Sequence, residues 1–165
     1  MESDAVRRIC YTPIGVIHSP FGSVEGMPIQ SAYAADVEGT ISIFHEYAGG
    51  LKDLARFSHI IAIYHFHLSN RFELEVRPFL DTETHGVFAT RAPNRPNPIG
   101  ISTFAILSVE GNNLHVKGID VVDGTPLLDI KPFVPEFDNR RPVRIGWMKG
   151  RLKGADEKRA DNRFV

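Results

Sequence analysis

The sequence predicts a mainly β fold, built as an antiparallel barrel or sandwich with short helices. The first observation is that short apolar or alternating segments recur along the chain with turn residues between them. The second is that regular helices do not separate these segments, which argues against a doubly wound α/β sheet. A closed or two-layered antiparallel sheet also protects its strand edges. At 165 residues the chain has the length of roughly one domain.

The predicted strands cover residues 11–18, 38–44, 58–67, 86–90, 101–109, 114–122 and 127–133. The segment 38–44 alternates isoleucine with threonine and serine, which is typical of a half-buried strand. Residues 58–67 are β-branched and aromatic, so this strand is expected to be buried on both faces. Apolar residues at helical spacing over 45–57 predict one short helix. The run Glu-Gly-Asn-Asn at 110–113 predicts a hairpin turn.

Charge is unevenly distributed along the chain. Residues 1–138 hold 10 Lys and Arg against 17 Asp and Glu, a net −7, whereas residues 139–165 hold 9 against 3, a net +6. A basic tail on an acidic body points to an anionic partner, and the alternative is a solvated terminus. Because turn and strand signals fade after Pro142, residues 154–165 are expected to be a frayed tail. We divide the chain into an N-terminal tail (1–10), a β domain (11–138) and a basic C-terminal extension (139–165).

Composition narrows the class of protein. Hydrophobic residues make up 42% of the chain, enough to exclude a wholly disordered protein. The longest apolar run, residues 60–64, is far shorter than the ~20 residues that a membrane span needs. Residues 1–12 carry charges and lack the apolar core of a secretory signal. Cys10 is the single cysteine, which excludes an intramolecular disulfide, so we expect a cytoplasmic protein.

The segment 91–100, Arg-Ala-Pro-Asn-Arg-Pro-Asn-Pro-Ile-Gly, predicts a stiff loop. Its three prolines fix backbone angles, and its two asparagines tolerate tight turns. Such a loop can hold Arg91 and Arg95 in place, so a binding loop is the favoured interpretation. A rigid connector whose arginines pair with local acceptors is the alternative.

Three carboxylates mark the segment 120–132. Asp123-Gly124 opens a turn between two apolar strands, and Asp120 and Asp129 lie at strand edges where a side chain can face a cleft. Ordinary turn chemistry explains this pattern when it is taken alone. A divalent cation site is not favoured, because no further carboxylate cluster joins these three.

His65 and His67 share one face of a predicted strand, so two imidazoles could bind zinc. No third ligand is evident, and we expect these histidines to line a cleft and the protein to hold no metal. The sequence also lacks GxGxxG after a strand, a Walker A loop and GxSxG, which removes the common nucleotide-binding and hydrolase motifs.

The chain resembles the TsaA-like family, also called the TrmO family. The matching stretches follow the family's order over about three quarters of the chain, from residue 11 to 138: residues 14–20, 28–30, 57–60, 86–91, 95–100, 122–126 and 128–132. The joint occurrence of Ala-Thr-Arg, Arg-Pro-Asn-Pro-Ile-Gly and Asp-Gly-Thr-Pro is specific to this family.

The resemblance implies a small single-sheeted β-barrel, a homodimer and S-adenosylmethionine as cofactor. It also implies methylation of N6 of threonylcarbamoyladenosine at position 37 of tRNA. The family's cofactor-binding segments fall here on Pro28, Ile29, Gln30, His67, Leu68, Arg91, Ile101, Asp120, Val121, Val122, Asp123, Gly124 and Thr125. Many relatives carry Arg where this chain has Ile29, so only a backbone contact at that position survives the change.

The residue types suit this chemistry. A carboxylate such as Asp120 or Asp123 can bind a hydroxyl or an amino group, and Arg91 can bind a carboxylate as a fork. His67 and Asp129 are candidates for the catalytic base. Candidate tRNA contacts are Arg95, Arg140, Arg141 and Arg144. The alternative functions are a cofactor-binding sensor without catalysis and a zinc hydrolase built on the two histidines.

Overall fold

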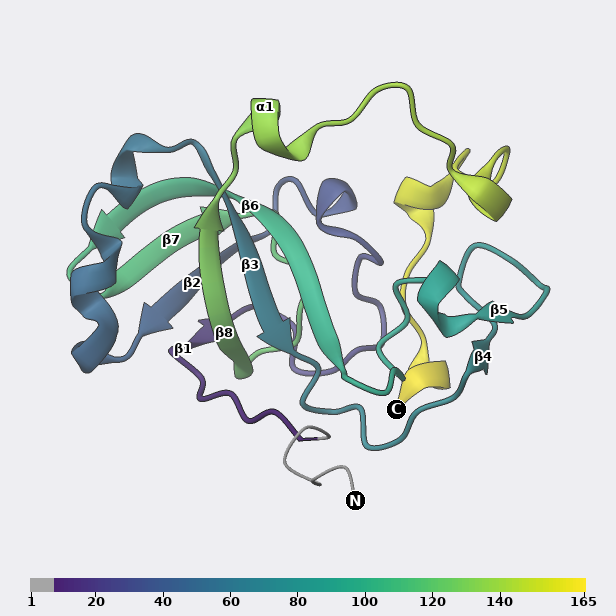
Figure 1. The fold of residues 1–165 in the computed structure, drawn as a ribbon. Coiled ribbons are helices and arrows are strands. Elements are labelled where there is room, and N and C mark those ends of the chain that lie inside the picture. Colours follow the sequence, from purple (N-terminus) through teal and green to yellow (C-terminus); the bar gives the residue numbers. More distant parts are fainter. Residues whose placement is uncertain (1–7) are drawn as a thin grey trace, which may run out of the picture.

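A computed structural model describes residues 8–165, so part of the expected N-terminal tail lies outside the described residues. Six strands close into one antiparallel barrel (Figure 1), and neighbours around it are β1 (Gly15–His18), β2 (Glu38–Ile43), β7 (Asn113–Lys117), β6 (Ile99–Glu110), β3 (His59–His65) and β8 (Thr125–Pro132). The barrel closes where β8 pairs back with β1. The predicted mainly β, single-sheeted barrel is therefore confirmed.

Aliphatic and aromatic side chains fill the barrel interior. Ile17 lies opposite Ile41 across β1 and β2, and Ile60 lies opposite Phe104 across β3 and β6. All four are fully buried, as is Leu127 on β8. Burying each such side chain contributes roughly 1.5–3 kcal/mol before the cost of ordering the chain. This packed interior makes the barrel a rigid base for the loops at its ends.

Strand β3 is buried on one face only. Ile60, Ala62 and Tyr64 point into the barrel and are buried, whereas Ile61 and Ile63 between them are half-buried. The expectation that this strand is buried on both faces is wrong, because no helical layer covers the outer face of this barrel. The hairpin predicted at 110–113 is confirmed, and it connects β6 with β7.

The helix predicted over residues 45–57 is wrong in type. Two 3-10 turns, His45–Leu51 and Leu54–Arg56, occupy the segment instead. The paired Gly49 and Gly50 lower the preference for a regular helix, and Asp53 adopts a left-handed backbone (φ 66°) that ends the first turn.

Three predicted strands are shorter in the structure than expected, and the first of them, β1, covers only the last four residues of the predicted strand 11–18. The expected strand 86–90 forms only a two-residue strand, β5 (His85–Gly86), which pairs with β4 (Glu75–Val76) and leads into a 3-10 turn at Val87–Ala89. Strand β7 ends at Lys117 and does not extend to residue 122, because Gly118 (φ 92°) turns the chain across the end of the barrel. A 3-10 turn at Ser31–Tyr33 follows the Pro28–Gln30 segment.

The C-terminal segment is folded. It contains α1 (Pro135–Asp138) and 3-10 turns at Gly146–Met148, Ala155–Glu157 and Asn162–Phe164. Ala155 and Phe164 are buried, so the expected frayed tail is wrong. In Figure 1, the yellow end of this segment lies beside β4 and β5, on the opposite side of the molecule from the blue 3-10 turns at His45–Leu51 and Leu54–Arg56.

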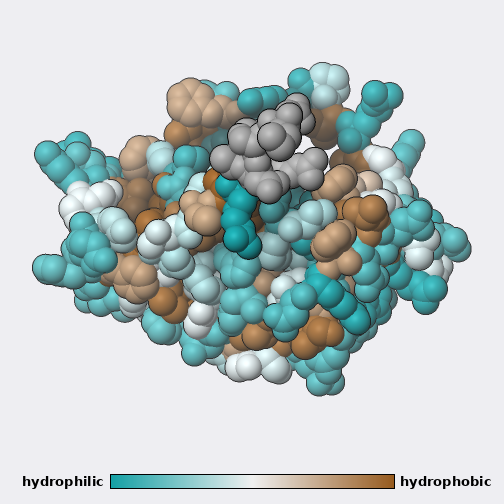
Figure 2. Space-filling model, turned by 60° about the horizontal axis from the view of Figure 1, so that its bottom comes forward, coloured by the Kyte–Doolittle hydropathy of each residue, from teal (hydrophilic) through white to brown (hydrophobic). Residues whose placement is uncertain are grey.

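Among residues 8–165 we find no helix with the length and apolar character that a membrane crossing requires. On the face shown in Figure 2, apolar residues form separate patches among polar ones.

Candidate functional site

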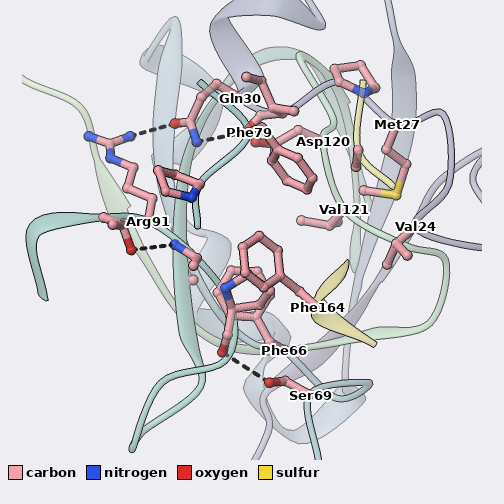
Figure 3. A pocket seen from close by; sticks show the side chains of 18 of the residues that line it. Val24, Met27, Gln30, Phe66, Ser69, Phe79, Arg91, Asp120, Val121 and Phe164 are labelled. Atoms are coloured by element: carbon pink, nitrogen blue, oxygen red, sulfur yellow. Dashed lines mark hydrogen bonds between the residues drawn. The ribbon is translucent and has the colours of Figure 1, made fainter. Parts of the chain in front are cut away.

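A cavity of about 540 Å³ lies between the end of the barrel and the C-terminal segment. This volume falls in the range of small-molecule sites. Most of its lining is apolar, and a few polar groups reach into it from separate elements. Figure 3 shows Gln30 and Arg91 on one side of the cavity, with Asp120 nearby and the rings of Phe66, Phe79 and Phe164 around its interior.

The structure brings together most of the residues predicted from the sequence. Twelve of them line the cavity: Pro28, Ile29, Gln30, His67, Leu68, Arg91, Arg95, Ile101, Asp120, Val121, Val122 and Thr125. Six others do not line it: Asp123, Gly124, Asp129, Arg140, Arg141 and Arg144.

Asp120 is the carboxylate of the cavity. The Ser102 hydroxyl donates a hydrogen bond to its Oδ1 (2.7 Å), and the Tyr64 hydroxyl lies 2.9 Å from the Ser102 oxygen. Because Ser102 uses its hydrogen on Asp120, Tyr64 must donate to Ser102. Burial and the Asp120 charge both raise the pKa of Tyr64, which keeps it protonated as the donor. A chain of two hydrogen bonds thus leads from the barrel interior to Asp120.

Burial raises the pKa of Asp120 to about 6. Ser102, the backbone of Ser31 and the charge of Arg91 oppose this shift, since each favours the ionised carboxylate. Asp120 can therefore exchange a proton close to neutral pH, which few surface aspartates do.

Arg91 is positioned by the Pro28–Gln30 segment. Its guanidinium donates to Gln30 Oε1 at 2.8 Å, and Gln30 Nε2 donates to the Ile29 carbonyl at 2.7 Å. The Ile29 side chain lines the cavity as an apolar surface. An exposed guanidinium held in this way remains able to bind an anionic group.

Arg95 holds its own loop together. One guanidinium nitrogen donates to the carbonyls of Val87 (3.2 Å), Thr90 (2.9 Å) and Ala92 (3.2 Å). These contacts favour the connector interpretation for Arg95, while Arg91 in the same loop faces the cavity and Gln30.

Asp123 and Asp129 lie in other surroundings. Asp123 accepts from the backbone of Ser19 at 3.1 Å and lies 3.3 Å from the His18 ring, so it holds the turn that precedes β8 against the end of β1. Asp129 forms an ion pair with Lys131 at 2.8 Å on the outside of the barrel. Among the three aspartates of this segment, only Asp120 reaches the cavity.

His67 lies in the cavity wall, and burial together with the nearby His65 lowers its pKa. This keeps the imidazole neutral at physiological pH. Across residues 8–165, the structure gathers no three His, Cys, Asp or Glu side chains in an arrangement that could hold a metal ion.

Several residues that line the cavity, and Ser102 behind Asp120, were not predicted from the sequence. Tyr64 and Ser102 lie within ordinary strand patterns, so nothing in their spacing distinguishes them from core residues. Trp147 and Phe164 come from the segment expected to be solvated or frayed. The one available signal was the single tryptophan of the chain, Trp147, which lies between the apolar residues Ile145 and Met148 within the basic segment.

Comparisons with known proteins agree with this geometry. The family described as "tRNA-methyltransferase O N-terminal domain" matches residues 16–139. A probable S-adenosyl-L-methionine-binding protein of Pyrococcus abyssi is 54% identical over 94% of this chain and 85% of its own length. The human tRNA (adenine(37)-N6)-methyltransferase is 33% identical over 79% of this chain, which spans only 31% of that enzyme.

Solved structures give the same result. A crystal structure of TrmO superposes with a TM-score of 0.73 at 38% identity, covering 84% of this chain and 64% of that one. The TrmO of Pseudomonas aeruginosa superposes with a TM-score of 0.72 at 34% identity, covering 85% and 62%. The chain spans less than two thirds of these two proteins. Since the family's domain covers three quarters of its residues, the chain belongs to the tRNA-methyltransferase O family.

Proposed function

We propose that this protein is an S-adenosylmethionine-dependent methyltransferase that acts on N6 of adenosine 37 in tRNA, with threonylcarbamoyladenosine as the form it modifies. The observation that carries the proposal is the cavity at the barrel end, where Asp120 and Arg91 meet apolar walls within the family's domain. The names of the relatives, an adenosine-37 methyltransferase and S-adenosylmethionine-binding proteins, support it.

The groups in the cavity fit this cofactor. S-adenosylmethionine has a flat aromatic base, a sulfonium cation, and an amino acid end with one positive and one negative group. The apolar walls suit the base, Asp120 suits a cationic or hydroxyl group, and Arg91 suits the carboxylate. When bound, the cofactor supplies an electrophilic methyl group.

The residues of the chain have two tasks in this reaction. The first is positioning, because holding two reactants in line can supply on the order of 7–11 kcal/mol of the barrier. The rigid barrel, the Gln30–Arg91 hydrogen bond and the Tyr64–Ser102–Asp120 chain serve this task. The second is accepting the proton of N6. Of the two base candidates from the sequence, His67 lines the cavity and Asp129 does not. Asp120, with its pKa of about 6, is a further candidate for the base.

Exposed arginines outside the cavity are proposed to hold the RNA. Arg140, Arg141 and Arg144 are solvent-exposed along the segment that runs from α1 toward the C-terminal turns. Phe88, with 77% of its surface exposed, lies three residues before Arg91 and offers a ring on which an unstacked base can lie.

The proposal is tested by incubating the protein with tRNA and S-adenosylmethionine carrying a labelled methyl group. We expect label on N6 of residue 37, identified by nuclease digestion and nucleoside mass analysis. Parallel reactions with tRNA that carries or lacks the threonylcarbamoyl group decide which form is the substrate. Cofactor binding by calorimetry with no label transferred to either tRNA would instead support the alternative function, a cofactor-binding sensor.

We also propose that the protein is a cytoplasmic homodimer, as the family resemblance implies. Light scattering of the purified protein at several concentrations tests the dimer. A mass equal to one chain, 18.4 kDa, at all of them would contradict it.

A further inference from the structure

Residues 145–165, here called the C-terminal strap, lie outside the stretch that matches the family domain. They nevertheless supply part of the cavity wall. Trp147, Met148, Leu152, Ala160 and Phe164 of the strap all line it. The cavity therefore depends on a segment that the family domain does not contain.

The strap is joined to the Pro28–Gln30 segment through its backbone. The Gly26 N–H donates to the Ala160 carbonyl, and the Ala160 N–H donates to the Met27 carbonyl, both at 2.8 Å. Pro28 and Arg159 form an antiparallel bridge at the same place. Strap and segment thus meet two residues before Gln30, which positions Arg91.

Phe164 attaches the end of the strap to a second small core. It is 9% exposed and packs with Val76, Val87 and Ala92. Its ring lies edge-on to Phe79, with centroids 5.3 Å apart. Figure 3 shows both rings at the cavity, so one side chain links this core to the cavity wall.

A third attachment surrounds Asp81. Arg151 and His85 each place a nitrogen 2.9 Å from Asp81 Oδ2. Trp147 stacks on His85, with centroids 4.4 Å apart and ring planes 15° apart, and its indole N–H donates to the Ala89 carbonyl. The hydrogen bond from His85 holds the pKa of Asp81 well below its usual value, so the carboxylate stays charged at physiological pH.

The chemistry of the strap indicates which part of a ligand it covers. Its lining residues are apolar apart from Asp161, whose carboxylate pairs with Arg163 of the strap itself at 2.7 Å. A wall of aromatic and aliphatic side chains suits a flat, uncharged base, and it offers nothing to a phosphate.

We infer that the C-terminal strap is a part of the cofactor site and binds the nucleoside half of the ligand. This inference rests on the proposed function. Because S-adenosylmethionine and its demethylated product share that half, loss of the wall weakens both to the same extent. Loss of the wall leaves Asp120 and Arg91 in place, and these two residues are proposed to bind the charged groups of the ligand.

The test uses the full chain and calorimetry with both compounds. Phe164→Ala removes a ring from the wall, and Leu152→Ala removes a side chain that is 42% exposed and carries little of the fold. We expect the dissociation constants for both compounds to rise about tenfold for Phe164→Ala and severalfold for Leu152→Ala. Val143→Ala, an equally conservative truncation just before the strap and outside the cavity, should bind as the parent does.

Hydrogen exchange provides a second readout. The cofactor should slow amide exchange in residues 145–165 of the parent protein. If Phe164→Ala fails to fold, as thermal unfolding would reveal, Leu152→Ala decides. Parental affinity in the folded variants, or exchange in the strap that is unchanged by the cofactor, would overturn the inference while leaving the proposed function intact. A parent protein that binds neither compound would overturn the proposed function itself.

Discussion

The carboxylate of Asp120 is half-buried beside Ser102 and Tyr64, and the guanidinium of Arg91 is a nearby cation. Its pKa in the folded protein is about 6, above the ordinary value of 3.8. Below about pH 3 the group is protonated in both the folded and the unfolded chain, so it costs the folded state no stability. As the pH rises from about 4 through 6 and beyond, the unfolded chain loses the proton more readily, so stability is lost.

Replacing Asp120 with Asn should therefore stabilise the protein at neutral pH. Asn keeps the acceptor for Ser102 and removes the cost of burying an ionised group. We expect the free energy of unfolding at pH 7.5 to rise by on the order of 2 kcal/mol, and the gain to vanish near pH 4. Denaturant unfolding at both pH values measures this. Asp36→Asn, at an exposed site, is the control. A gain of equal size at both pH values would contradict the assignment.

The same carboxylate should make cofactor binding depend on pH. A cationic ligand favours ionised Asp120, so binding should lower the pKa of Asp120, and affinity should rise between about pH 5 and pH 7. Calorimetry across this range measures the slope. In Asp120→Asn the slope should be absent and the affinity lower. A slope that persists in the variant would mean that another group, with His67 the first to examine, titrates with the ligand.

Gly100 shows why the Pro-Asn-Pro-Ile-Gly motif ends in glycine. A Cβ at this position would lie 2.2 Å from the Tyr64 ring and 2.8 Å from the Phe66 ring. We expect Gly100→Ala to lower the free energy of unfolding by about 1–3 kcal/mol, because the ring of Tyr64 is buried and would have to shift away from its hydrogen bond with Ser102. Gly49→Ala, where a Cβ meets nothing, is the control in thermal unfolding. Equal effects at the two positions would refute this explanation.

Some of the site residues predicted from the motifs lie at the cavity. Arg91, Gln30 and Asp120 are among them. Sequence reasoning could not separate Asp120 from Asp123, because both fall in one short segment and their surroundings depend on distant partners, Ser102 for Asp120 and His18 with Ser19 for Asp123. Nor could it find Ser102, whose role depends on a cross-strand neighbour rather than on its own sequence context.

At the scale of elements, the guanidinium of Arg95 stabilises the loop from Val87 to Arg95 by donating hydrogen bonds to three of its carbonyls. We expect Arg95→Met to lower the free energy of unfolding by about 1–3 kcal/mol, since the Thr90 and Ala92 carbonyls lose this donor, whereas the Val87 carbonyl keeps the Thr90 N–H and hydroxyl. Amide exchange in residues 87–95 should also become faster. The control, Arg71→Met, removes an equal charge from an exposed residue whose ion pair with Glu73 spans 3.7 Å. It should change neither the free energy of unfolding nor the amide exchange of residues 87–95. Unchanged exchange in Arg95→Met would refute the connector interpretation.

The elements that could be predicted are those whose pattern is local. Strands β2 and β6 lie close to their predicted positions because alternating side chains face a packed interior and the solvent. The strap could not be predicted, since its structure comes from contacts made far along the chain. Met27 is paired with Ala160, and Asp81 with Arg151. Considered without those partners, the sequence of the strap is basic and contains glycine, which is typical of a solvated tail.

At the scale of the whole molecule, the chain separates its charges. The barrel and its loops carry a net −7, and residues 139–165 carry +6, part of which lies in the folded strap. Arg151 and Arg163 of the strap are paired with Asp81 and Asp161. We propose that the exposed arginines between α1 and the strap meet the phosphates of the RNA. An acidic barrel would otherwise repel an RNA.

Neutralising Arg140, Arg141 and Arg144 together, each to Gln, should weaken tRNA binding about tenfold or more at low salt. It should also reduce the steepness of the salt dependence by about 2–3, because each phosphate contact releases close to one counterion. Binding titrations at several salt concentrations measure both. Cofactor affinity should stay at the parental value, since none of the three lines the cavity.

The control changes Lys52, Arg56 and Lys117 to Gln, which removes the same charge from the barrel and its 3-10 turns, away from the strap. If both triple variants lose affinity and salt dependence equally, net charge alone attracts the tRNA; if neither does, the RNA-binding surface lies elsewhere, with Arg71 and Arg77 the next exposed arginines to test.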